Sequence, residues 1–198
     1  MPTKLILIRH GITEWNIKKR YSGFIDIALS EKGLLQSRLL AKRLKDATIH
    51  KVYSSDRKRA IQTAKIIFKK LKIEKIPGIR EMHFGVFEGL THKEILEKHA
   101  NIYRKWLLDP SRCKIPEGEH LSSFKQRVVS AFKKIIALNK NKTTAVVCHG
   151  GAISIYLMHI LKSKEFWKNI PHSASITVIE YKRNAPKIIL QDDTRHLR

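Results

Sequence analysis

Short apolar runs and amphipathic stretches alternate along the chain. The run "LILI" at residues 5–8 has no polar position, which is typical of a central strand covered on both faces. In residues 29–46, leucines recur at helical spacing behind Ser30, a residue type that favours an N-cap. These leucines are Leu34, Leu35, Leu39, Leu40 and Leu44. The pattern predicts a buried strand followed by a surface helix.

The same alternation continues to the end of the chain. Asp56 is a candidate N-cap, and Thr91 with Glu94 has the spacing of a capping box. Further strands are predicted in residues 50–55, 74–77, 143–148, 175–181 and 187–191, and helices in residues 56–72, 91–99, 122–138 and 153–161. This order implies parallel strands with crossover helices. We expect a three-layer α/β/α sandwich with a mainly parallel central sheet, formed as a single domain by residues 1–198.

Composition fits a globular cytoplasmic protein. Hydrophobic residues make up 42% of the chain and charged residues 29%, and no apolar stretch approaches the length of a membrane span. The N-terminus lacks the layout of a cleavable signal peptide. Cys113 and Cys148 are too few for a disulfide framework, and we expect buried free thiols. Cys148 and His149 point to opposite faces of a strand, so they cannot form a catalytic dyad with each other.

The chain carries a large excess of positive charge. Lys and Arg number 40 against 17 acidic residues, which gives a net charge of +23. The basic residues are scattered over many segments, including wet faces of the predicted helices, and no single segment carries them. Scattered charge favours attraction of anionic substrates over a dedicated nucleic-acid groove. A nucleic-acid-binding protein that uses this basic surface remains the alternative from another functional class.

Two of the predicted strands end in the same dipeptide. His10–Gly11 follows the first strand and His149–Gly150 follows the strand at 143–148. Ligands bind outside the carboxyl ends of strands in open α/β sheets, so the two histidines are expected at one edge. Glycine lets the backbone come close to a ligand, and the amides that follow can face an anion. Arg9 adds a planar fork of donors for phosphate or carboxylate oxygens.

A third strand end carries arginines in an unfavourable place. Arg57 and Arg59 fall in the first turn of the helix predicted after residues 50–55. Cations there oppose the helix dipole unless an anion lies between them. Together with the two His-Gly strand ends, these positions indicate an anion-binding site.

Several segments resemble the histidine phosphatase superfamily, which includes the cofactor-dependent phosphoglycerate mutases. "LIRHGITEWN" resembles the signature of the superfamily, and "VYSSDRKRAIQTA" resembles the segment with its second arginine. "IREMHFGVFEGLTHKEI" is similar to the stretch with its acidic residue, "PEGEHLSSF" to a substrate loop, and "VVCHGGAI" to the second histidine motif. The tail "DDTRHL" resembles the ending of phosphatases acting on α-ribazole phosphate and of related broad-specificity enzymes. The resemblance covers nearly the whole chain.

The resemblance implies roles for individual residues. His10 matches the nucleophile that takes the phosphoryl group, and Glu81 matches the proton donor to the leaving oxygen. Arg9, Arg59 and His149 match the residues that hold the phosphate oxygens. Positions lining the phosphate pocket are Asn16, Ser22, Gly23 and the amide of Gly150. Neither a metal ion nor a cofactor is implied, because arginines neutralise the phosphate dianion.

Some positions depart from the pattern of the superfamily. Cys148 stands where Ser or Thr is common and should mainly change packing. His83 and His120 occupy places where other polar residues would match, and their roles are left open. Glu88 is a rival carboxylate near Glu81, but "FEGL" favours a structural hydrogen bond or a loop cap.

The short segment between Glu81 and His149 favours hydrolysis over phosphoryl transfer. Mutases of the superfamily carry a longer insertion there, which shields the phosphohistidine from water. We therefore expect a phosphatase acting on a small phosphorylated metabolite, with a mutase as the alternative and the substrate open. No H-x-x-E-H or H-E-x-x-H spacing supports a metallohydrolase. The apolar strand at 175–181 could lie at a sheet edge and pair between subunits in a homodimer.

Overall fold

A mixed sheet forms the centre of the molecule. The computed structural model describes residues 2–183 and 185–198, and within them the strands form one six-stranded sheet in the order β3-β2-β4-β1-β5-β6. The strands are β1 Thr3–Arg9, β2 Lys51–Ser54, β3 Ile73–Lys75, β4 Thr143–Cys148, β5 Ile176–Lys182 and β6 Ala185–Asp193. The first four in this order are parallel, whereas β5 and β6 are antiparallel to their neighbours.

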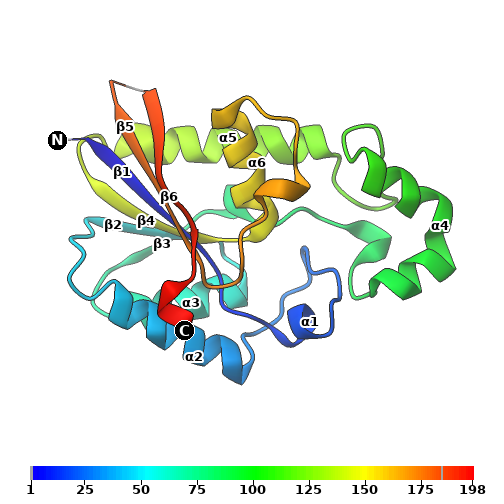
Figure 1. The fold of residues 1–198 in the computed structure, drawn as a ribbon, viewed down its shortest axis with the longest axis horizontal. Helices are drawn as coiled ribbons and strands as arrows, with labels where there is room; N and C mark the ends of the chain where they lie inside the picture. Colours follow the sequence, from blue (N-terminus) through cyan, green and yellow to red (C-terminus); the bar gives the residue numbers. More distant parts are fainter. Residues whose placement is uncertain (1, 184) are drawn as a thin grey trace.

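Helices cover both faces of this sheet. Figure 1 shows α2 and α3 on one face and α5 and α6 on the other, with α4 beyond the edge of the layers. The α-helices are α1 Glu14–Ile17, α2 Glu31–Arg43, α3 Lys58–Ile67, α4 His92–Leu108, α5 Leu121–Leu138 and α6 Gly150–Leu161. Short 3-10 turns lie at Pro77–Ile79, Gly85–Phe87, Trp167–Asn169 and Arg195–Leu197. The predicted three-layer α/β/α sandwich with its mainly parallel sheet is confirmed.

The two faces of the sheet build separate apolar cores. In β1, Leu5 and Leu7 belong to the core under α5 and α6, while Ile6 and Ile8 belong to the core under α2 and α3. This division follows from strand geometry, because successive side chains point to opposite faces. A run without polar positions is therefore what a strand covered on both sides requires.

Most predicted helix starts are found, and one is wrong. The side chain of Ser30 accepts from the amide of Gly33, and the capping box at Thr91 is present. Asp56 was a candidate cap for α3, but the N-cap is Arg57, without a side-chain cap hydrogen bond. Both carboxylate oxygens of Asp56 instead accept from Arg80, because a bidentate charge-assisted pair is stronger than a cap.

Other helix boundaries also differ from the sequence-based expectation: α3 ends at Ile67 rather than at residue 72, and α6 begins at Gly150 rather than at residue 153. Helix α4 continues to Leu108, and its backbone departs from helical geometry at His99, where the predicted helix ended. Helix α5 begins after His120, whose side chain accepts from the amide of Ser122. This cap gives a structural role to His120, which the sequence had left open.

The strand expected at a sheet edge lies inside the sheet. β5 pairs with β1 on one side and with β6 on the other, so the prediction that residues 175–181 form an edge is wrong. The chain turns back after β5 and covers it with β6, which leaves β3 and β6 as the edges of the described sheet. Cys113 and Cys148 are buried free thiols, as predicted. Among the described residues, no helix is long and apolar enough to cross a membrane.

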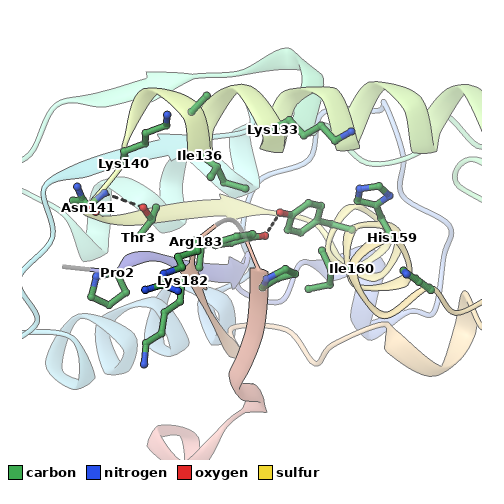
Figure 2. Close-up of a pocket in the computed structure, with 15 residues that line it drawn as sticks. Pro2, Thr3, Lys133, Ile136, Lys140, Asn141, His159, Ile160, Lys182 and Arg183 are labelled. Carbon is green, nitrogen blue, oxygen red and sulfur yellow. Dashed lines mark hydrogen bonds between the residues drawn. The ribbon is translucent and has the colours of Figure 1, made fainter.

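A cavity of about 1160 Å³ opens beside the last turns of α5 and α6. Figure 2 shows Lys133 and Ile136 of α5 and His159 of α6 around it, and the hydroxyl groups of Tyr156 and Tyr181 are hydrogen-bonded to each other within its lining. Helix α6 has 12 residues, so its two ends are about 18 Å apart. The cavity is therefore well separated from the carboxyl ends of β1 and β4, where α6 begins.

Two leucines of α2 provide a matched test of this packing. Leu40 is fully buried and Leu35 is 53% exposed on the same helix. We expect Leu40→Ala to lower the free energy of unfolding by about 2–5 kcal/mol, because it removes buried apolar atoms and leaves a cavity. Leu35→Ala should change the same quantity by less than about 1 kcal/mol. Urea unfolding followed by circular dichroism measures both, and equal losses would contradict the assigned register of α2.

Candidate active site

The carboxyl ends of β1 and β4 bring His10 and His149 together. The two strands are parallel neighbours in which Arg9 lies opposite Cys148, and the amide of His10 donates to the carbonyl of Cys148 at 3.0 Å. The centroids of the two imidazole rings are 5.2 Å apart, with the ring planes at 64°. The two His-Gly strand ends thus meet at one edge of the sheet, as the sequence predicted.

The ring of His10 is buried and held in one tautomer. Its Nδ1 lies 2.7 Å from the carbonyl oxygen of Gly11, and because a carbonyl can only accept, Nδ1 carries the proton. Burial, together with the charges of Arg59 and Arg9, holds the pKa of His10 well below its ordinary value. His10 is therefore neutral at physiological pH, and its Nε2 has a free lone pair.

Two guanidinium groups lie beside the histidines, that of Arg59 buried and that of Arg9 half-buried, and backbone carbonyls hold both of them. Arg9 donates from Nη1 to the carbonyl of Pro171 at 2.5 Å. Arg59 is fully buried and donates from Nη1 to the carbonyl of Ile25 at 3.1 Å and from Nη2 to that of Gly23 at 2.8 Å. Burial lowers the pKa of both groups, that of Arg59 to about 10, so both stay charged at neutral pH.

These two charges keep donors available for an anion. The Nε of Arg9 and the Nε of Arg59 are buried and have no hydrogen-bond partner in the described part of the chain. Carbonyls orient a guanidinium group but do not neutralise it. A buried cation without a counterion is costly, so the site is set up to receive negative charge.

Glu81 is a buried carboxyl group at the same strand ends. It accepts from the amide of Met82 at 2.9 Å and from the amide of Gly151 at 2.9 Å. Burial raises the pKa of Glu81, although these two hydrogen bonds and the charges of Arg59 and Arg9 act in the opposite direction. Gly151 is required here, because a Cβ atom would lie 2.3 Å from a carboxyl oxygen of Glu81.

Ser55 is a member of the site that the sequence did not indicate. It follows β2, and its Oγ lies 2.8 Å from Nε2 of His149. The Nδ1 of His149 is buried and has no partner among the described residues. Burial, with the charges of Arg59 and of the other site groups, holds the pKa of His149 well below its ordinary value. The only available signal for Ser55 was its place at the end of a third parallel strand.

Ser22, Gly23 and Gly150, three of the pocket residues predicted from the resemblance, lie beside the guanidinium groups. The carbonyls of Ser22 and Gly23 accept from Nη2 of Arg59, and the Oγ of Ser22 is buried without a partner in the described residues. A Cβ atom on Gly150 would lie 3.1 Å from Cζ of Arg9, so a larger residue there would press on the guanidinium group. Gly150 thus allows the close approach of Arg9, whereas a Cβ atom on Gly23 would lie 2.3 Å from the carbonyl oxygen of Met82 and 2.4 Å from a carboxylate oxygen of Glu88.

Asn16 serves the local backbone in this structure. Its Oδ1 accepts from the amide of Thr13 at 3.0 Å, and its own amide donates to Oγ1 of Thr13 at 3.2 Å. This reciprocal pair is the capping box of α1. The Nδ2 of Asn16 is left over for another contact. A direct role in the pocket therefore stays a prediction.

Glu88 holds the loop that carries Ser22 and Gly23. It accepts from the amides of Phe24 and Ile25, both at 2.7 Å, and from the amide of Phe84 at 3.1 Å. The prediction that Glu88 has a structural role is confirmed. Nε2 of His83 lies 3.7 Å from a carboxylate oxygen of Glu88, and the His83 ring packs edge-on against Phe24, with centroids 4.7 Å apart.

The assembled groups can capture and cleave an anionic ester. They comprise a neutral imidazole with a free lone pair, two guanidinium groups without carboxylate partners among the described residues and a buried carboxyl group whose pKa is raised. Groups of these three kinds can serve in nucleophilic attack, charge neutralisation and proton donation. Among the described residues, no three His, Cys, Asp or Glu side chains are grouped so that they could hold a metal ion.

Comparison with known proteins gives the family. Residues 5–194 match the profile of the histidine phosphatase superfamily (branch 1). The chain belongs to the histidine phosphatase superfamily. Phosphoserine phosphatase 1 of Hydrogenobacter thermophilus is 34% identical over 199 residues, which cover 98% of this chain and 94% of that protein. The metal-independent phosphoserine phosphatase of Arabidopsis thaliana is 32% identical, with 98% and 83% covered.

A solved structure extends the comparison to three dimensions. The phosphoserine phosphatase of Entamoeba histolytica in complex with 3-phosphoglyceric acid has a TM-score of 0.90 and 30% identity, over 99% of this chain and 100% of that one. The protein is accordingly an enzyme of the histidine-type phosphatase class. The family and enzyme class expected from the sequence motifs are confirmed.

The role of Glu88 can be tested without measuring activity. Glu88→Ala removes the acceptor for three backbone amides, so we expect faster hydrogen–deuterium exchange in a peptide that covers residues 22–25. The increase should exceed about tenfold, since the loop loses its charge-assisted hydrogen bonds. Glu97→Ala, at an exposed glutamate of α4, is the matched control and should leave this exchange unchanged. Unaltered exchange in Glu88→Ala would refute the anchoring role.

Proposed function

We propose that this phosphatase hydrolyses small phosphomonoesters through a covalent phosphohistidine on His10, without a metal ion or cofactor. The observation that carries the proposal is the fixed tautomer of His10. Its Nδ1 donates to the carbonyl of Gly11, which leaves Nε2 as a neutral nucleophile beside the cations of Arg9 and Arg59. A phosphate dianion can be approached by a neutral imidazole once fixed positive charge neutralises it.

In the first step, Nε2 of His10 attacks phosphorus and the bond from phosphorus to the ester oxygen breaks. Arg9 and Arg59 hold the phosphoryl oxygens with their free Nε–H groups, and the unpartnered Nδ1 of His149 adds a polar contact. Glu81 gives its proton to the departing oxygen, so the product is an alcohol rather than an alkoxide. The raised pKa of Glu81 supports this role, because the acid must be protonated before the step.

In the second step, water attacks phosphorus and the nitrogen–phosphorus bond breaks. The carboxylate of Glu81, ionised by the first step, takes a proton from this water. The products are inorganic phosphate and free His10, and Glu81 is again protonated. Each step is a single phosphoryl transfer between positioned groups, which is how covalent catalysis divides a difficult hydrolysis.

The substrate class is proposed from the relatives and from the site. Proteins that resemble this chain over nearly its whole length are named phosphoserine phosphatases, and one of them was solved with 3-phosphoglyceric acid. We therefore place phosphoserine and small glycerate phosphates first, with α-ribazole 5′-phosphate as a further candidate. The short segment between Glu81 and His149 supports hydrolysis over the mutase alternative.

Phosphate release in excess EDTA tests the mechanism. Wild-type protein should release phosphate from phosphoserine, α-ribazole 5′-phosphate, 3-phosphoglycerate and p-nitrophenyl phosphate, with and without chelator alike. His10→Ala should lose at least about 10³-fold, because the nucleophile is gone. His159→Ala, at the other end of α6, is the matched control and should retain activity.

Three results would contradict this proposal. Sensitivity to EDTA would indicate a metallohydrolase, and activity that survives in His10→Ala would remove the phosphohistidine. Isomerisation of 3-phosphoglycerate without net phosphate release would instead identify a mutase. A nucleic-acid-binding protein would be indifferent to His10 and would lose affinity steeply with added salt.

The pH dependence of kcat/KM should reflect the shifted pKa values of His10 and Glu81. Because the pKa of His10 is lowered, His10 stays a free base below pH 6.5, and kcat/KM should not fall there as pH is lowered through this value. Because the pKa of Glu81 is raised, its acid form persists to higher pH, and kcat/KM should decline as pH rises through that shifted pKa. A loss of activity centred near pH 6.5 on the acid side would contradict the assigned state of His10.

Replacing Glu81 should separate substrates by their leaving groups. Glu81→Gln should lower kcat/KM for phosphoserine by about 10²–10⁴-fold and abolish the alkaline decline. The loss should be smaller for p-nitrophenyl phosphate, whose leaving group is a weak base and needs little protonation. Glu97→Gln is the control at an exposed position. Equal losses on both substrates would contradict a general-acid role.

A further inference from the structure

Three guanidinium groups surround the ring of Phe24 near the phosphate pocket. Cζ of Arg57 lies 4.8 Å from the ring centroid, that of Arg80 5.5 Å and that of Arg127 6.0 Å. Phe24 directly follows Gly23, whose carbonyl holds Arg59, and Glu88 fixes its amide. Its ring is therefore attached to the loop that borders the phosphate pocket.

Two of these three guanidinium groups are neutralised by carboxylates. Nε of Arg80 donates to Asp56 at 2.7 Å, and Nη2 of Arg127 donates to Glu119 at 2.7 Å. Both pairs are bidentate. Such pairs orient the side chains and leave little positive charge for another ligand.

Arg57 carries the charge that is left uncompensated. Among the described residues its guanidinium group has no carboxylate partner, and its Nε is buried without a hydrogen-bond partner. The acidic residues nearby have other partners. Both carboxylate oxygens of Asp56 accept from Arg80, and Asp26 accepts from the amide of Lys58 at 2.7 Å. Arg57 is thus a half-buried cation that is oriented against the ring of Phe24 and has no carboxylate partner among the described residues.

Arg57 is also electrostatically connected to the catalytic groups. It is the N-cap of α3, two positions before Arg59, and cations at a helix N-terminus are unfavourable unless an anion is present. Its charge contributes to the lowered pKa of His149 and of Arg59. Arg57 therefore lies within electrostatic range of the phosphate pocket without being one of its buried arginines.

We propose that Arg57 and Phe24 form a second anion subsite beside the phosphate pocket. The group it takes is a carboxylate or a comparable negative group on the organic part of the substrate, whose carbon skeleton rests against the ring of Phe24. The inference rests on the proposed phosphatase function and narrows it to phosphomonoesters that carry a second negative charge. A guanidinium group that is held against an aromatic ring and has no carboxylate partner suits a carboxylate group of the substrate.

Two matched pairs of substrates isolate the second charge. 3-Phosphoglycerate and glycerol 3-phosphate differ by a carboxylate, and so do phosphoserine and phosphoethanolamine. Arg57→Gln should lower kcat/KM about 10- to 100-fold for the carboxylate members, mainly through KM, which is the size of one charge-assisted hydrogen bond. The members without a carboxylate should change less than about threefold. Lys58→Gln removes the same charge from the adjacent exposed residue and should discriminate neither pair.

A binding measurement keeps this inference separate from the proposed catalysis. Calorimetric titration of His10→Ala with 3-phosphoglycerate and with glycerol 3-phosphate needs no turnover, and adding Arg57→Gln should weaken the first about 10- to 100-fold and leave the second unchanged. Equal effects of Arg57→Gln on both members of a pair, or no effect on either, would overturn the subsite. Loss of the carboxylate preference in Lys58→Gln would assign it to general surface charge and overturn it as well. His10-independent phosphate release with an intact carboxylate preference would overturn the mechanism alone.

Discussion

The guanidinium groups of Arg59, which is buried, and of Arg9, which is half-buried, have no carboxylate partner within the described part of the chain, and the site is arranged around that constraint. The carbonyls of Pro171, Ile25 and Gly23 orient Arg9 and Arg59 while leaving their charges intact. The same charges, added to burial, keep the imidazoles of His10 and His149 neutral. A carboxylate in place of these carbonyls would oppose the part of the lowered pKa of His10 that comes from Arg59 and Arg9, whereas burial, its largest cause, would still act. In the mechanism proposed above, the same two arginines therefore bind the anion and help to keep the nucleophile unprotonated.

Glu81 lies near the same two arginines, but its proposed role requires it to keep a proton rather than to stay unprotonated. Nearby arginines favour its ionised form, as do the amides of Met82 and Gly151, yet burial outweighs them and raises its pKa. The close approach of Gly151 matters because it fixes the carboxyl group by hydrogen bonds rather than by an ion pair. In the proposed mechanism, Glu81 has to hold its proton beside two cations, and its position is set by backbone amides, one of them that of Gly151 in the first turn of α6.

The sequence predicted the features that depend on local pattern. Buried strands with no polar position, helix caps at Ser30 and Thr91, and two His-Gly strand ends all follow from short stretches, and parallel topology then brings the histidines together. What it missed depends on contacts between distant segments. Asp56 pairs with Arg80 rather than capping α3, and the side chain of Ser55, which follows β2, is hydrogen-bonded to that of His149, which follows β4. Likewise β5 is internal because the chain turns back to cover it, an outcome that its apolar composition does not specify.

Positive charge acts in this molecule at two ranges. The net charge of +23 is spread over the surface, where screening limits each charge to about 10 Å in 0.1 M salt. A scattered excess of this kind attracts anions in general and cannot distinguish one phosphate ester from another. Discrimination needs a cation whose position is fixed and whose charge is not already matched. Arg80 and Arg127 meet only the first condition, since Asp56 and Glu119 neutralise them, whereas Arg57 meets both. If Arg57 forms the proposed subsite, selectivity for the organic part of the substrate depends on how the neighbours of each arginine are paired, more than on how many arginines there are.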